Sequence, residues 1–213
     1  MGYKLNNNNK SNHKTIFLLY VSVMLIITFL QQEFVLLPEF QSFDLVNEES
    51  KSTILENWQK WRWLSFVFSP ILLLFRLCLV SMCLFAGSFF FPEMTCRKYK
   101  DWWSVAMVAQ SVMIFYSVVL CVFNIMSGTN ESLEVSKCTS LLFLGGDNME
   151  QWVKIPLSAL NIFEIVYWFV MSKLVSVKAG STFVRSFKFV ISSYGVGYLF
   201  YIALLMFLIL YLN

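Results

Sequence analysis

Two charged residues lie deep inside apolar segments of this chain, and their side chains are its strongest candidates for chemistry. Arg76 lies in the apolar run 64–91, and Glu164 lies in the run 156–175. A charge near the middle of a membrane costs at least about 2.5–3.5 kcal/mol, so it persists only where it is paired or solvated. At about 1.5 Å per helical residue, Arg76 lies about 18 Å and Glu164 about 12 Å from the outer ends of their runs. Because a long arginine side chain bridges that difference, we expect the two residues to form an intramembrane ion pair.

Three roles for this pair are compatible with the sequence. The pair locks two membrane helices together, or it couples transport to a proton or an anionic substrate, or it is completed by a partner protein. Each role requires both charges to face the interior of a helical bundle or a water-filled cavity rather than lipid.

No pattern of residues in the sequence supports catalysis. The only histidine, His13, lies in the polar N-terminal stretch. The sequence has no H-E-x-x-H motif, no clustered metal ligands and no glycine-rich phosphate loop. A serine nucleophile needs a base, and no histidine or lysine lies deep inside the apolar runs. We therefore expect a protein that is not an enzyme and that uses no metal and no cofactor.

Five apolar runs make up most of the chain and position these charges. Of the 213 residues, 58% are hydrophobic and 14% are charged, which is too apolar for a soluble domain of this length. A helix crosses a ~30 Å hydrocarbon core with roughly 20 residues, and each run reaches that length. The composition predicts an all-α polytopic bundle: residues 1–14 form a flexible cytoplasmic tail, and residues 15–213 form one five-helix transmembrane domain. The expected spans are 15–37, 64–91, 103–126, 156–175 and 189–212.

The connections between the runs alternate in charge, and this alternation predicts the orientation. One set carries ten cations against Glu93 and Asp101, and the other set carries ten acids against five cations. The ten cations are Lys4, Lys10, Lys14, Arg97, Lys98, Lys100, Lys173, Lys178, Arg185 and Lys188. Because cytoplasmic loops carry an excess of Lys and Arg, the N-terminus is expected in the cytoplasm and the C-terminus outside.

Polar and small residues recur at helical spacing within the runs. We expect Gln110, Asn124 and Asn161 to lie on the polar faces that meet inside the bundle. Such faces either pack helix against helix or line a water-filled path. Tryptophan favours the membrane–water boundary, so Trp102 and Trp103 are expected to anchor the cytoplasmic end of the third span.

A short apolar run lies in the second outer connection, 127–155. Leu141–Leu144 is too short to span and is followed by two glycines and an aspartate. Because such a run is costly to leave in water, we expect a partner protein or the membrane interface to contact Phe143, Gly145 and Gly146.

A pattern over about residues 157–210 supports the same architecture. It consists of an acidic residue followed by bulky aromatics in the fourth run, then a short basic connection before an apolar final run. The residues that carry it are Asn161, Glu164, Tyr167, Trp168, Thr182, Phe183 and Lys188. The pattern resembles the last two spans of the Yip family, which are five-span membrane proteins with a cytoplasmic N-terminus. That resemblance implies a non-enzymatic membrane protein.

The sequence therefore predicts a small membrane subunit or accessory factor of a transport, export or assembly complex. A self-contained transporter or channel that uses Arg76 and Glu164 is the alternative. The expected partners are membrane lipids and a larger membrane-protein complex, with a homo-oligomer as the alternative assembly. The cations are too few and too scattered for nucleic-acid binding. The expected location is the inner membrane of a bacterium.

Overall fold

The computed structural model describes residues 9–38, 48–92, 94, 96, 98–127, 139–144 and 151–212. Within these ranges every named element is a helix. The elements, in chain order, are α1 (Asn9–Gln31), η1 (Gln32–Leu36), α3 (Glu48–Phe90), α4 (Tyr99–Ala109), α5 (Ser111–Ser127), η2 (Leu141–Leu144), α7 (Gln151–Ala159), α8 (Ile162–Ala179), α9 (Phe183–Val190), η3 (Ile191–Gly195) and α10 (Val196–Leu212). The all-α prediction is therefore confirmed for the described part of the chain.

Four stretches of helix among the described residues are long and apolar enough to cross a membrane. They are Lys14–Leu36, Glu56–Phe90, Tyr99–Met126 and Phe183–Tyr211, and they overlap the first, second, third and fifth predicted spans. The chain is thus a multi-pass membrane protein. Residues 9–14, which the sequence analysis placed in a flexible tail, already belong to helix α1.

The fourth predicted span, 156–175, is not one continuous helix, and that part of the prediction is wrong. Helix α7 ends at Ala159 and α8 begins at Ile162, so the chain leaves helical geometry at Asn161. Asn161 has an extended backbone, with φ −109° and ψ 162°. The side chains before and after Asn161 therefore do not share one helical face, contrary to the spacing argument.

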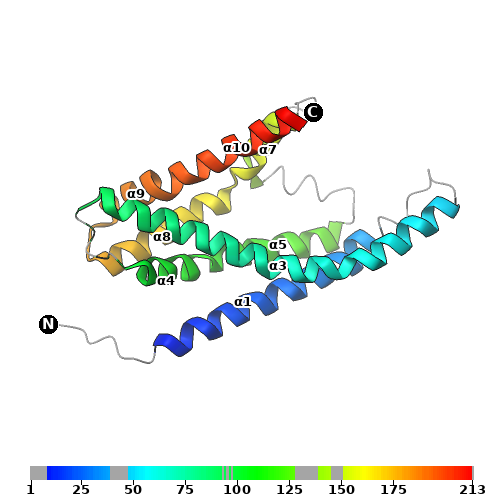
Figure 1. Cartoon of the computed structure of the whole chain (residues 1–213), viewed down its shortest axis with the longest axis horizontal. Coiled ribbons are helices and arrows are strands. Elements are labelled where there is room, and N and C mark those ends of the chain that lie inside the picture. The colour runs from blue at the N-terminus through cyan, green and yellow to red at the C-terminus, as the bar shows by residue number, and fades with distance from the viewer. Residues whose placement is uncertain are drawn as a thin grey trace.

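The long helices run back and forth along one axis (Figure 1). Helix α1 packs against α3 and α5, and α8 packs against α4, α5 and α9. Helix α1 begins and helix α10 ends at opposite ends of the bundle, and α8 returns toward the end where α1 begins. Helix α3 is visibly bent in Figure 1, and it contains Pro70, which removes one backbone hydrogen bond.

Small residues bring α3 close to the last helical stretch, η3 and α10, near the end of the bundle that the charges predict to be cytoplasmic. A Cβ atom placed on Gly87 would lie 2.3 Å from the Cβ of Ser193, and one on Gly197 would lie 2.7 Å from the Cys83 sulfur. Neither position leaves room for a side chain. Small residues thus allow close backbone approach here, as they commonly do between membrane helices.

Trp102 is a core residue and not an interfacial anchor. Its side chain is fully buried, and its ring lies 5.2 Å from that of Phe189. The preference of indole for the membrane boundary is outweighed here by close packing of aromatic rings between α4 and α9. The prediction for Trp102 is therefore wrong, whereas its neighbour Trp103 is partly exposed.

Candidate functional site

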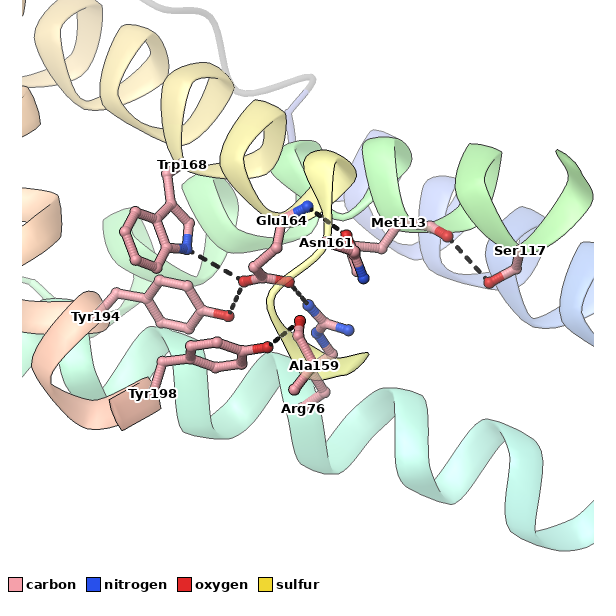
Figure 2. Close-up of polar contacts among 9 residues, drawn as sticks. All are labelled: Arg76, Met113, Ser117, Ala159, Asn161, Glu164, Trp168, Tyr194 and Tyr198. Atoms are coloured by element: carbon pink, nitrogen blue, oxygen red, sulfur yellow. Dashed lines mark hydrogen bonds and ion pairs between the residues drawn. The ribbon is translucent and has the colours of Figure 1, made fainter. Parts of the chain in front are cut away.

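The structure brings Arg76 of α3 and Glu164 of α8 together. The Arg76 Nη2 atom donates a hydrogen bond to Glu164 Oε2 at 3.1 Å, across a sequence separation of 88 residues. Figure 2 shows the two side chains approaching each other from facing helices. The contact joins the second and fourth predicted spans, as the charge count led us to expect.

The Glu164 carboxylate is held on both of its oxygens. Oε1 accepts a hydrogen bond from the Tyr194 hydroxyl at 2.7 Å and another from the Trp168 indole at 3.2 Å, while Oε2 accepts from Arg76 (Figure 2). The side chain is only 3% exposed. Glu164 also lies in the first turn of α8, where the positive end of the helix dipole favours a negative charge. The carboxylate is therefore a fully satisfied anchor.

The break before α8 is what positions this anchor. The Asn161 Oδ1 atom accepts a hydrogen bond from the Glu164 backbone N–H at 2.7 Å, so Asn161 is the N-cap of α8. The carbonyl groups that the break releases are also satisfied. Ala159 O accepts from the Tyr198 hydroxyl at 2.7 Å, and Leu160 O accepts from Leu141 N–H at 3.0 Å. Ser140 and Asn161 form an isolated antiparallel bridge, which ties the outer segment to the break.

Arg76 is held differently from its partner. Its guanidinium carbon lies 5.5 Å from the centre of the Tyr167 ring, which supports the cation on one side. The Arg76 side chain is 35% exposed, compared with 3% for Glu164. A guanidinium has five N–H donors. One donates to Glu164, and the Tyr194 hydroxyl also lies within hydrogen-bonding reach, so these two contacts do not use all five.

A cavity of about 700 Å³ lies beside Arg76, between α1, α3, α5, the start of α8 and α10. Its polar lining residues are Thr28, Gln31, Ser65, Ser69, Arg76, Gln110, Ser117, Asn161 and Glu164. Its other lining residues are largely apolar or aromatic. This volume is within the range of about 300–1,000 Å³ that is usual for small-molecule sites.

The polar residues predicted to face the bundle interior divide into two groups. Gln110 and Asn161 both line the cavity, and both are buried. The Gln110 Oε1 atom has no hydrogen-bond partner within the described part of the chain. Asn124 does not line the cavity, and its Oδ1 atom is likewise buried without a partner among the described residues.

The predicted partner contact lies away from this cluster. Phe143 of η2 is 68% exposed and does not line the cavity. Gly145 and Gly146 lie outside the described residues. Within the described ranges, no group of three His, Cys, Asp or Glu side chains is arranged to hold a metal ion.

Sequence reasoning missed Tyr194 and Tyr198 as members of the site. Tyrosines in an apolar final span carry no distinctive pattern, so nothing in the sequence pointed to them. The N-cap was detectable, because Asn161 followed three residues later by Glu164 is a capping-box arrangement ahead of an apolar run.

Comparisons of this chain with protein-family models, with curated proteins and with solved structures find no match. The resemblance of residues 157–210 to the Yip family therefore stays a prediction.

Proposed function

We propose that this protein is a non-enzymatic, five-span membrane protein that binds a ligand inside the membrane, beside Arg76, and acts as a small transporter. The observation that carries the proposal is the cavity of about 700 Å³ that the partly exposed Arg76 side chain borders. Arg76 is the more exposed partner of the pair, with 35% of its side chain accessible compared with 3% for Glu164, and it lines the cavity.

The course of the chain supports five spans. Helix α8 has 18 residues, which is near the minimum for a crossing, and it carries Glu164, Lys173 and Lys178. With α8 as a fifth crossing, α10 ends on the side opposite to the start of α1, in agreement with the arrangement of these helices in Figure 1. The basic connections then lie in the cytoplasm, as the charge alternation predicts. We retain the inner membrane of a bacterium as the expected location.

Access of water to the cavity tests the proposal. In a variant without native cysteines, Ser69→Cys places a thiol in the cavity wall, and Val67→Cys places one on the exposed face of the same helix at a similar depth. A charged, water-soluble thiol reagent should modify Ser69→Cys and leave Val67→Cys unmodified in intact membranes. If neither thiol reacts, water does not enter the cavity and the transporter proposal is wrong.

An accessory subunit of a larger membrane complex is the second candidate, and Phe143 is the observation that favours it. An exposed aromatic ring in η2 is held in place, because Leu141 bonds to the carbonyl of Leu160 and Ser140 pairs with Asn161. Leu141 of the same element is also exposed, so η2 presents two neighbouring apolar side chains to a partner.

Replacing Phe143 tests this second candidate. Phe143→Asp should release a co-purifying membrane partner from native membranes, whereas Phe143→Leu, which keeps the apolar surface, should retain it. Equal recovery of the partner with both variants would count against a docking role for η2.

A further inference from the structure

We infer that the ligand of the cavity is a single-chain amphiphile whose head group is an anion, either a carboxylate or a phosphate. This inference rests on the proposed function, since it names the class of ligand that the same cavity takes. Two features carry it: the hydrogen-bonding character around Arg76 and the opening of the cavity toward lipid.

The polar end of the cavity combines the Arg76 cation with neutral amide and hydroxyl side chains. Among the described residues, Glu164 is the only carboxylate in the lining, and both of its oxygens already accept hydrogen bonds. Arg76 contributes guanidinium N–H groups, and the amides of Gln110 and Asn161 can donate as well as accept. The N-terminus of α8, with its partial positive charge, borders the same end of the cavity. An oxyanion would therefore interact more favourably with this end of the cavity than an ammonium group would.

The apolar walls extend from this polar end to the surface that faces lipid. Phe68 and Leu72 of α3 and Tyr201 of α10 line the cavity and are each about half exposed or more, at 49%, 62% and 50%. Figure 1 shows α3 and α10 diverging from each other toward the end at which the chain terminates. An acyl chain can therefore enter sideways between these helices while its head group reaches Arg76.

Protection of the Ser69→Cys thiol from the water-soluble reagent tests this assignment. The probes share a 16-carbon chain and differ in head group: palmitate, lysophosphatidate, hexadecanol and hexadecylamine, with acetate as a head group without a chain. A hydrogen bond to a charged group contributes enough to raise affinity by about tenfold or more. We expect palmitate or lysophosphatidate to protect the thiol at concentrations at least about tenfold lower than hexadecanol requires.

Each outcome separates one part of the inference. Stronger protection by palmitate points to a free fatty acid, and stronger protection by lysophosphatidate points to a lipid phosphate. Equal protection by hexadecanol or hexadecylamine would overturn the anionic head group, and equal protection by acetate would overturn the acyl chain. A thiol that reacts but that no amphiphile protects would contradict this inference alone, whereas a thiol that never reacts would contradict the proposed function itself.

A variant then assigns the head-group contact to Arg76. The double substitution Arg76→Leu with Glu164→Leu removes both charges together, and we expect it to lose the preference for palmitate over hexadecanol. A preference that survives this change would overturn the role of Arg76. The comparison of head groups in the protein with Arg76 intact does not depend on whether the double variant folds.

Discussion

Arg76 and Glu164 form one ion pair, but their surroundings give them different roles. Glu164 accepts bonds from Tyr194, Trp168 and Arg76, and both of its oxygens are used. Arg76 is partly exposed and lines the cavity. The acidic partner thus fixes the position of the basic one, and the basic one faces the cavity.

The interdependence of the two charges predicts a compensating pair of substitutions. Arg76→Leu and Glu164→Leu should each lower the stability of the folded protein by about 3–5 kcal/mol, because each leaves the opposite charge buried without its partner. The double substitution should recover much of that loss, measured as the thermal unfolding midpoint in detergent.

A matched control comes from an ion pair that is well exposed. Lys60→Leu removes the partner of Glu56, and both side chains are about two-thirds exposed, at 64% and 67%. That substitution should leave the midpoint nearly unchanged. Losses at Arg76 and Glu164 that simply add would mean that the two residues do not depend on each other.

The pair itself was predictable from the sequence, because counting charges left only these two residues deep within apolar runs. The rest of the cluster was not. Tyr194 and Tyr198 look like ordinary members of an apolar span. Only the tertiary fold gives them polar partners, namely Glu164 of α8 for Tyr194 and the Ala159 carbonyl of α7 for Tyr198. The burial of Trp102 was missed for the same reason, because tertiary packing outweighs the general preference of tryptophan for the membrane boundary.

At the scale of elements, the break between α7 and α8 places the Glu164 carboxylate at a helix N-terminus. Hydrophobicity alone predicted one continuous span over 156–175, since the residues on both sides of Asn161 are largely apolar. The capping pattern from Asn161 to Glu164 was the local signal for the break.

The contribution of the Asn161 N-cap to the stability of the protein can be measured. Asn161→Ala removes the acceptor for the Glu164 N–H and should lower the free energy of unfolding by about 0.5–2 kcal/mol. Asn161→Ser keeps a side-chain oxygen at the cap and should lose less. Equal thermal midpoints for the alanine variant and the original protein would mean that the cap does not stabilise α8.

The close contact between α3 and the last helix gives a second prediction at this scale. Gly87→Ala places a methyl group 2.3 Å from the Ser193 Cβ, so the helices must separate, and overpacking of this kind costs about 1–3 kcal/mol. The matched control is Gly195→Ala, whose Cβ would lie 3.7 Å from its nearest neighbour, an ordinary contact. Thermal unfolding should distinguish the two, and Ser193→Gly should restore the Gly87→Ala variant.

At the scale of the whole molecule, the two ends of the bundle are held by different means. At the cytoplasmic end predicted from the charges, glycines allow α3 and the last helix to touch. At the other end η1 and α3 are linked by polar contacts: Arg62 donates to Glu33 at 2.6 Å, and Gln32 donates to the carbonyl of Arg62 at 3.0 Å. The cavity lies between these two regions.

The orientation of the molecule can be checked with its own cysteines. Cys138, which lies outside the described residues, belongs to a connection predicted to face outward, and Cys96 belongs to the basic connection between α3 and α4. A membrane-impermeant thiol reagent should modify Cys138 in intact cells and should reach Cys96 only after the cells are opened. A Cys138→Ser variant identifies the labelled site, and the reverse pattern would invert the predicted topology.

In the proposed five-span topology, the ion pair also constrains how this protein enters the membrane during its synthesis. Helix α8 would then carry three charged residues, Glu164, Lys173 and Lys178, and charged residues within a membrane segment oppose its insertion. Arg76 belongs to a helix that is made earlier, and pairing with it lowers the cost of placing Glu164 in the membrane. Insertion of α8 is thus expected to depend on a residue translated 88 positions before Glu164.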